Sequence, residues 1–134
     1  RKPTARKFLT RYAQDLSEKI RENIIKECIQ IMNTSEFAPL FGPGSRAEVP
    51  ITGLINTHEL ISGQIDRLYI DDDNIWIIDF KTNRPPPQDI KDAPAIYKSQ
   101  MRAYHDTLRT IYPHHRIHCA LLWTDGPLLM PIEI

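Results

Sequence analysis

The segment Ile75–Ile78 is apolar at every position, and no other feature of the sequence constrains the fold as strongly. A strand with one face in solvent alternates apolar and polar side chains, whereas a strand that is buried on both faces does not. The turn residues Asp71–Asn74 precede this segment, and another strand candidate, Glu59–Ile70, precedes the turn. The pattern therefore predicts a hairpin whose second strand, Asn74–Phe80, is a central strand of a sheet.

The remaining elements follow from periodicity and from breaker residues. Apolar residues spaced three and four apart predict one long helix over residues 4–32 and a second helix over residues 93–112. The segment 33–45 is rich in Pro and Gly and predicts a loop. Further strands are expected over residues 46–51, 116–123 and 128–133. This order of elements predicts an α/β fold, with a mixed sheet of about five strands flanked by helices.

The length bounds the domain organisation. The 134 residues suffice for one hydrophobic core and are too few for two. We therefore expect a single domain over residues 1–134, with the long helix ahead of a core over residues 46–134. The sequence starts with Arg1 rather than Met and ends on the strand-like Pro131–Ile134, so we interpret it as a fragment of a larger protein. No apolar stretch approaches the roughly 18–20 residues that span a bilayer, and no membrane association is expected.

Charge and cysteine content exclude some classes of protein. The formal charge is zero, with 17 basic and 17 acidic residues. A protein that binds nucleic acid by itself usually has a basic excess, so the balance counts against a stand-alone binding protein. It does not count against a catalytic domain whose substrate is delivered by other domains. Cys28 and Cys119 form no Cys-x-x-Cys pair, which predicts buried free thiols in a reducing, cytoplasmic environment.

The expected hairpin places two acidic side chains opposite each other. A two-residue loop would pair Asp71 with Asn74. The same register puts Asp66 directly opposite Asp79, with Cβ atoms about 4.5–5.5 Å apart on one face of the sheet. Lys81, two residues beyond Asp79, points to the same side of its strand.

Two opposed carboxylates repel each other, and burying such a charge without a partner is costly. A divalent cation removes this difficulty, because carboxylate oxygens are preferred ligands of Mg²⁺, which bridges to phosphate. Glu48 is polar within an apolar stretch and could supply a third carboxylate, while Lys81 could hold or deprotonate the attacking water. The alternative at this point is a solvated Asp-x-Lys ion pair at a strand end, which usually contributes little.

Three motifs resemble the nuclease domain of the RecB/AddA branch of the PD-(D/E)XK superfamily. They are Gly63–Leu68, Ile77–Arg84 with its Asp-x-Lys element, and Gln100–Tyr104 with the pattern Gln-x-x-x-Tyr. The segments Ser45–Pro50 and Ala120–Thr124 resemble the AddA type in particular. The resemblance covers nearly the whole chain, and the combination of motifs is far more specific than any one of them. It implies a restriction-endonuclease-like fold and a Mg²⁺-dependent deoxyribonuclease that acts as an exonuclease.

The resemblance also implies roles for individual residues. Mg²⁺, for which Mn²⁺ can substitute, would bind the side chains of Glu48, Asp66 and Asp79 and the backbone carbonyl of Phe80. Lys81 would position the nucleophilic water.

Other residues are implied as contacts to DNA. Gln100 and Tyr104 lie four residues apart, on one face of a helix, and could contact phosphates beside the metal. Tyr104 also fits the apolar stripe of that helix, so core packing is an equal alternative. Candidate contacts to the DNA backbone, each of which is more often a solvated surface residue, are Arg67, Arg84, Lys98 and Arg102.

The larger context is likewise implied by the resemblance. The domain would end an AddA-like ATP-dependent helicase–nuclease that works in double-strand break repair and recombination. Helicase domains of the same polypeptide would deliver a single-stranded DNA end, and an AddB-like second subunit would be the partner. Many relatives have a metal-binding His upstream, whereas this sequence has none before His58. If that ligand precedes Arg1, weak metal binding and low activity of this fragment are expected.

Two alternatives and several exclusions complete the prediction. The chain could be a catalytically incomplete clamp that binds DNA without cutting it, or a scaffold whose acidic pair has no role. Zinc binding by the histidines around His118 and Cys119 is disfavoured, because their spacing does not match a zinc site. The sequence has no phosphate-binding loop and no four-cysteine set, so an ATP-driven motor and an iron–sulfur cluster are not expected in it.

Overall fold

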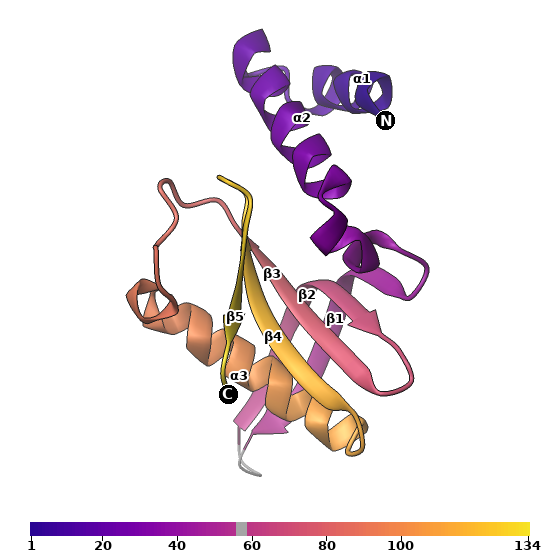
Figure 1. Ribbon diagram of the computed structural model, residues 1–134, viewed down its shortest axis with the longest axis vertical. Coiled ribbons are helices and arrows are strands. Elements are labelled where there is room, and N and C mark those ends of the chain that lie inside the picture. Colours follow the sequence, from indigo (N-terminus) through magenta and orange to yellow (C-terminus); the bar gives the residue numbers. More distant parts are fainter. Residues whose placement is uncertain (56–58) are drawn as a thin grey trace. The chain divides into compact units, whose positions relative to one another are not determined.

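The computed structural model describes residues 1–55 and 59–134 (Figure 1); His58 lies outside them. The elements are α1 (Lys2–Tyr12), α2 (Glu18–Asn33), the 3₁₀-helix η1 (Ser35–Phe41), β1 (Ser45–Ile55), β2 (Glu59–Ile70), β3 (Asn74–Lys81), the 3₁₀-helix η2 (Ile90–Asp92), α3 (Ala95–Ile111), β4 (Arg116–Trp123) and β5 (Leu128–Ile132). The described chain forms two compact units, residues 1–38 and 39–134. The prediction of a single domain stays a prediction. Within the described ranges, no helix has the length and apolar character needed to cross a membrane.

The first unit corrects the prediction of one long helix over residues 4–32. Helix α1 ends at Tyr12, and α2 begins at Glu18. The break has a local cause, because the Ser17 hydroxyl accepts a hydrogen bond from the Ile20 amide at 3.3 Å and so caps the start of α2. Apolar spacing alone does not register such a cap. Cys28 is exposed on α2, so the prediction of a buried thiol is wrong there.

The second unit contains a five-stranded mixed sheet in the order β1-β2-β3-β4-β5. Strands β3 and β4 run parallel, and the other neighbouring pairs are antiparallel. A parallel pair needs a crossover connection, which here contains α3. The predicted α/β fold is therefore confirmed. The loop expected over residues 33–45 contains η1, which the sequence pattern did not predict.

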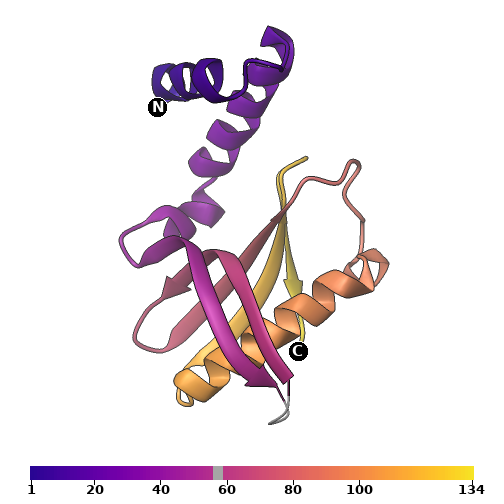
Figure 2. The ribbon, with the colours of Figure 1, turned by 180° about the vertical axis from the view of Figure 1, so that it is seen from behind.

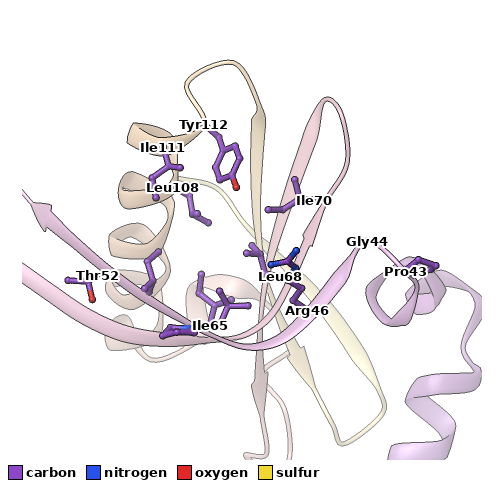
Figure 3. A pocket seen from close by; sticks show the side chains of 13 residues that line it. Pro43, Gly44, Arg46, Thr52, Ile65, Leu68, Ile70, Leu108, Ile111 and Tyr112 are labelled. Atoms are coloured by element: carbon purple, nitrogen blue, oxygen red, sulfur yellow. The ribbon is translucent and has the colours of Figure 1, made fainter.

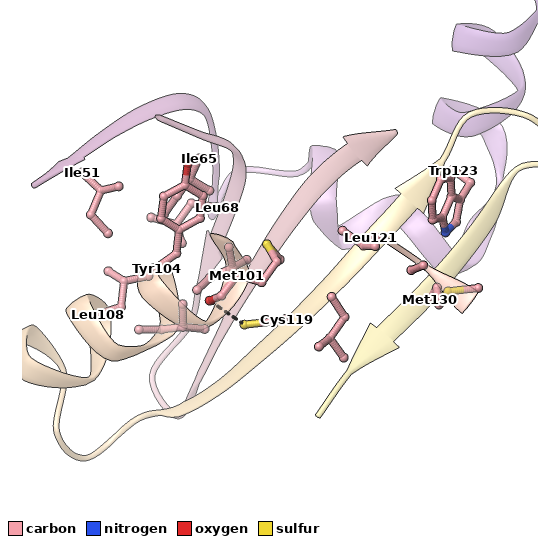
Figure 4. Packing of buried hydrophobic residues seen from close by; sticks show 14 residues of the cluster. Ile51, Ile65, Leu68, Met101, Tyr104, Leu108, Cys119, Leu121, Trp123 and Met130 are labelled. Atoms are coloured by element: carbon pink, nitrogen blue, oxygen red, sulfur yellow. Dashed lines mark hydrogen bonds between the residues drawn. The ribbon is translucent and has the colours of Figure 1, made fainter. Parts of the chain in front are cut away.

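Helix α3 packs against the sheet and closes the main core (Figure 4). Met101 and Leu108 of the helix meet Ile65 and Leu121 of the strands, and all four are buried. The close approach depends on Gly63, where an added Cβ would lie 2.7 Å from the Tyr104 hydroxyl oxygen. A side chain at this position would force the Tyr104 ring to shift.

The central strand is buried as its sequence predicts. Ile75, Ile77 and Ile78 are each 0% exposed, so both faces of β3 are covered. Residues of β3 alternate in direction, and the fully apolar run therefore supplies side chains to both sides of the sheet.

The pairing of β2 with β3 stops early. It runs from Ile70–Ile75 to Arg67–Ile78, whereas β3 and β4 stay paired as far as Lys81–Trp123. Strand β2 instead continues alongside β1 as far as Glu59. The two strands therefore form a fork, and Figure 2 shows them leaving their common hairpin and diverging. The fork opens at the positions of Asp66 and Asp79.

Candidate active site

The hairpin sets the register that the sequence predicts. The Asp71 amide donates to the Asn74 carbonyl at 3.0 Å, which closes the two-residue loop. The pairs from Ile70–Ile75 to Arg67–Ile78 follow from this closure. One further step along the same register leads to Asp66 and Asp79, where ladder pairing has ended.

Asp66 occupies the gap between the diverging strands. Its carboxylate oxygen Oδ2 accepts a hydrogen bond from the Phe80 backbone amide at 2.8 Å. The side chain thus satisfies an amide of β3 that has lost its partner on β2, since an unpaired buried amide is costly. This bond fixes one carboxylate oxygen of Asp66 and holds the group beside Asp79.

Asp79 is a buried acid, with 5% of its surface exposed. Burial raises the pKa of its carboxyl group above the usual value, and the nearby charge of Asp66 raises it further, while Lys81 acts in the opposite direction. The raised pKa shows that the surroundings of Asp79 disfavour its negative charge. Additional positive charge would relieve this penalty.

Lys81 supplies part of that positive charge. Its ammonium lies 2.5 Å from Asp79 Oδ2, and the Lys81 side chain is 14% exposed. The same nitrogen lies 3.8 Å from the centre of the Tyr97 ring. A desolvated cation–π contact contributes ~2 kcal/mol, which is similar to the ~2 kcal/mol of rotamer entropy lost when a lysine is fixed. The ring can therefore offset the cost of holding the amine in one place.

Unpartnered polar atoms gather at this end of the sheet. In the part of the chain that the structure describes, three buried side-chain atoms have no hydrogen-bond partner: Asp79 Oδ2, Trp123 Nε1 and Thr124 Oγ1. The Lys81 contact to Asp79 Oδ2 is thus an ion pair by distance, without the geometry of a hydrogen bond. All three atoms lie at the carboxyl ends of β3 and β4 or directly after them. Such atoms fit a site that takes a polar ligand, a water or a cation.

Glu48, the predicted third carboxylate, lies on β1 but does not join the acidic pair. It is the β1 residue opposite Asp66, between the pairs Ala47–Arg67 and Val49–Ile65, yet it is unpaired. Its φ of 52° is left-handed, which is uncommon for a residue other than Gly. Its side chain is exposed, and the described residues contain no cluster of three acidic, His or Cys side chains suited to a metal ion. The structure therefore brings Asp66, Asp79 and Lys81 together without the Glu48 carboxylate.

The Gln-x-x-x-Tyr element lies on α3 and faces the sheet. Tyr104 is 6% exposed, and its hydroxyl donates to the Gln64 carbonyl at 3.2 Å. The Gln100 side-chain amide in turn donates to the Tyr104 hydroxyl at 3.2 Å. Of the two interpretations of Tyr104, core packing is the one that these contacts support, and its hydroxyl ties the helix to β2.

The predicted basic contacts differ from one another. Arg67 donates through Nε to the Leu40 carbonyl at 2.7 Å and lies over the Phe41 ring, so its head group is engaged within the fold. Arg84 lies 3.4 Å from Asp125 in an exposed ion pair. Arg102 is exposed on α3 and Lys98 is half-buried there. Arg84, Lys98 and Arg102 keep surface positions that a DNA backbone could reach.

A large cavity of the second unit lies elsewhere. It measures about 630 Å³ and lies between β1, β2 and the end of α3, with Arg46, Leu68 and Tyr112 in its wall (Figure 3). Asp66, Asp79 and Lys81 do not line it. Its lining residues include no acidic group for metal chemistry, so we place the candidate active site at the fork and not in this cavity.

One residue of the site was missed in the sequence. Tyr97 fits the apolar stripe of the helix expected over residues 93–112, and its contact with Lys81 joins residues that are 16 positions apart. No local pattern encodes this contact.

Comparison with known proteins agrees with the geometry. The sequence matches the PD-(D/E)XK nuclease superfamily over residues 2–125. It is also 34% identical over 84 residues to an ATP-dependent helicase/nuclease subunit of Moorella thermoacetica, in an alignment that covers 63% of this chain and 5% of that protein. The resemblance to the AddA branch is thereby confirmed. With an acidic pair and a lysine at the fork of its sheet, the chain belongs to the PD-(D/E)XK nuclease superfamily.

Proposed function

We propose that the chain is a metal-dependent deoxyribonuclease domain that hydrolyses phosphodiester bonds. The observation that carries the proposal is the grouping of Asp66, Asp79 and Lys81 at the fork between β2 and β3. Asp79 is buried and its pKa is raised, while one of its oxygens has no hydrogen-bond partner among the described residues. Lys81 compensates this buried charge only in part, from 2.5 Å, and a divalent cation fits as an additional partner.

The residues that would hold Mg²⁺ or Mn²⁺ are Asp66, Asp79 and the Phe80 carbonyl, while the carboxylate of Glu48, which the sequence also suggested, is exposed and does not join them. Their oxygen atoms are the donors that these cations prefer. When bound, the cation supplies Lewis acidity toward the phosphate and lowers the pKa of water.

The protein's own residues account for the rest of the reaction. The Phe80 amide holds Asp66, so this carboxylate stays oriented without reorganisation. Lys81 orients the attacking water and neutralises the negative charge that grows on the phosphate. In hydrolysis, the water oxygen bonds to phosphorus, the bond to the leaving sugar oxygen breaks, and that oxygen gains a proton. Lys98, Arg84 and Arg102 would contact the strand beside the reacting phosphate.

The similarity to a helicase/nuclease protein extends the proposal to the biological setting. That relative is far longer than this chain, which spans 5% of its length. We infer that the domain works as the exonuclease of an ATP-dependent helicase–nuclease in double-strand break repair and recombination. Its substrate would be a single-stranded DNA end delivered by helicase domains, and an AddB-like subunit would be its partner. The neutral net charge supports delivery by other domains.

A second candidate function has one observation in its favour. Glu48 is exposed and does not join the acidic pair, so the ligand set gathered at the fork is small. A domain of this fold that clamps DNA without cutting it would need no complete metal site. The basic side chains on α3 serve either function.

Cleavage of end-labelled single-stranded DNA in the presence of Mn²⁺ distinguishes a nuclease from a DNA clamp. We expect wild-type protein to release labelled products and Lys81→Ala to slow cleavage by at least ~100-fold, as the loss of a group that stabilises transition-state charge does. Lys91→Ala is the matched control, because Lys91 forms an exposed Asp-x-Lys pair with Asp89 at 3.6 Å. A wild type that binds DNA and never cleaves it supports the clamp instead.

A further inference from the structure

We propose that Tyr97 is a positioning residue for Lys81, holding the ammonium in place by the face of its ring. This inference rests on the proposed function and deepens it, because it concerns the amine of the same site. Nothing in the sequence distinguishes Tyr97 from the other apolar residues of its helix.

The geometry singles out the ring. Lys81 Nζ lies 3.8 Å from the ring centre of Tyr97, well within the roughly 6 Å over which an aromatic face attracts a cation. The Lys81 side chain is 14% exposed, so solvent screens this attraction little. The ammonium also lies 2.5 Å from Asp79 Oδ2. The amine is thus held between a carboxylate and an aromatic face.

The ring itself is fixed from two sides. Its hydroxyl donates to the Asn83 side-chain carbonyl at 3.2 Å, which ties the first turns of α3 to the chain that leaves β3. The ring also lies beside the fully buried Trp123, with ring centres 6.2 Å apart and the planes tilted by 52°. A ring that is anchored in this way can impose a position on a flexible lysine, which has four rotatable bonds.

The aromatic face has a property that a second carboxylate would lack. It attracts the ammonium without adding negative charge to a site where Asp66 and Asp79 already repel each other. It also makes no use of the oxygens of Asp79. Lys81 therefore keeps its place when these oxygens are engaged by another partner, and this constancy is what positioning an attacking water requires.

Three variants test the inference by kinetics. Tyr97→Leu removes the ring, Tyr97→Phe keeps the ring and removes the hydroxyl, and Tyr112→Leu repeats the first change at the other end of α3. With single-stranded DNA and Mn²⁺, we expect Tyr97→Leu to lower kcat at least ~10-fold while KM changes less than ~2-fold. Tyr97→Phe should retain both constants within ~2-fold, and Tyr112→Leu should do the same.

A second measurement needs neither DNA nor cation. In protein with ¹³C-labelled lysine, the ring current of Tyr97 should place the Lys81 Hε and Cε resonances upfield of those of the other lysines, with the assignment made by their loss in Lys81→Arg. The upfield shift should persist in Tyr97→Phe and vanish in Tyr97→Leu. If wild type cleaves no DNA, the proposed function fails, while this comparison still decides the role of Tyr97.

Two results would overturn the inference. One is a Lys81 resonance that does not move in folded Tyr97→Leu. The other is a Tyr97→Phe variant that loses as much kcat as Tyr97→Leu, which would assign the effect to the hydrogen bond with Asn83. A circular dichroism spectrum and an unfolding curve for each variant show whether it is folded, and Tyr97→Met replaces Tyr97→Leu if the latter is not.

Discussion

The two ends of β3 both carry acidic side chains, and their surroundings act on them in opposite directions. At the hairpin end, the exposed Asp71 accepts hydrogen bonds from the amides of Asp73 at 2.9 Å and Asn74 at 2.6 Å, which lower the pKa of its carboxyl group. At the fork, burial raises the pKa of Asp79. The strand thus stabilises negative charge at one end and penalises it at the other.

The opposite pKa shifts of Asp71 and Asp79 indicate which acidic side chain is a candidate for catalysis. Asp71 is satisfied by backbone amides of the hairpin and serves the turn, which needs no ligand. Among the described residues, Asp79 Oδ2 has no hydrogen-bond donor, and Lys81 contacts it as an ion pair. A perturbed acid that is paired with a specific cation is a candidate for function, whereas a satisfied turn acid is not.

Neutralising one acid at each end should give the largest contrast. We expect Asp79→Asn to reduce DNA cleavage by at least ~100-fold, because the amide keeps the shape and removes the charge that a cation needs. Asp72→Asn at the hairpin should leave the rate within ~2-fold. Initial rates on single-stranded DNA with Mn²⁺ measure both. Equal losses in the two variants would remove the distinction between the ends.

Relief of repulsion at the fork should be visible in stability. In the metal-free protein, we expect Asp66→Asn to raise the free energy of unfolding by roughly 0.5–1 kcal/mol, in the usual range for a single substitution. The amide oxygen can still accept from Phe80, while the charge that raises the pKa of Asp79 is gone. Urea unfolding in EDTA measures the change, and Asp72→Asn is the control. A clear destabilisation by Asp66→Asn would show that the two carboxylates do not oppose each other.

The pH dependence of stability should have opposite signs at the two ends. The folded pKa of Asp79 lies above its usual 3.8, so its contribution to stability grows as pH falls through the raised pKa toward that value. The folded pKa of Asp71 lies below 3.8, so its contribution is complete at neutral pH and is lost as pH falls through the lowered pKa. Relative to wild type, metal-free Asp79→Asn should lose stability on acidification and Asp71→Asn should gain it. Urea midpoints at neutral pH, at about pH 4 for Asp79 and at about pH 3 for Asp71 test this, and changes of the same sign in the two variants would contradict it.

Between the two ends of β3, the buried Cys119 of the neighbouring strand β4 serves as a reference. Here we expect the smallest effect, which is no thiol labelling at all. Cys119, opposite Ile77, is 2% exposed, and burial raises the pKa of its thiol to about 12. We expect no reaction with a thiol reagent in the native state of Cys28→Ser, because almost no thiolate forms and access is blocked. The exposed Cys28 should react in wild type. Rapid native labelling of Cys119 would mean that the sheet opens between its two ends.

Much of the fold could be predicted because it depends on short-range rules. The hairpin register follows from four turn residues, and the burial of β3 follows from its unbroken apolar run. Strands β2 and β4 have the predicted bounds, since alternation and turn chemistry act within a few residues. The break between α1 and α2 also has a local cause, the Ser17 cap. The prediction missed it because the apolar stripe continues across the break.

The candidate site was predicted in part for the same reason. Asp66, Asp79 and Lys81 belong to one hairpin, so the sequence alone could bring them together. Glu48 is on another strand, and its left-handed backbone could not be read from its neighbours. Tyr104 fitted a core position and a DNA contact equally well, and only the hydrogen bond to Gln64 distinguished them.

The sequence by itself determined the hairpin, its acidic pair and the lysine beyond it, because pairing register and side-chain alternation are properties of adjacent residues. Only the tertiary structure decided that β2 and β3 part at Asp66, that Asp79 is buried there and that Tyr97 lies over Lys81. These features depend on how α3 crosses back over the sheet. Its placement is set by the packing of side chains that are distant in sequence, and no local pattern encodes it.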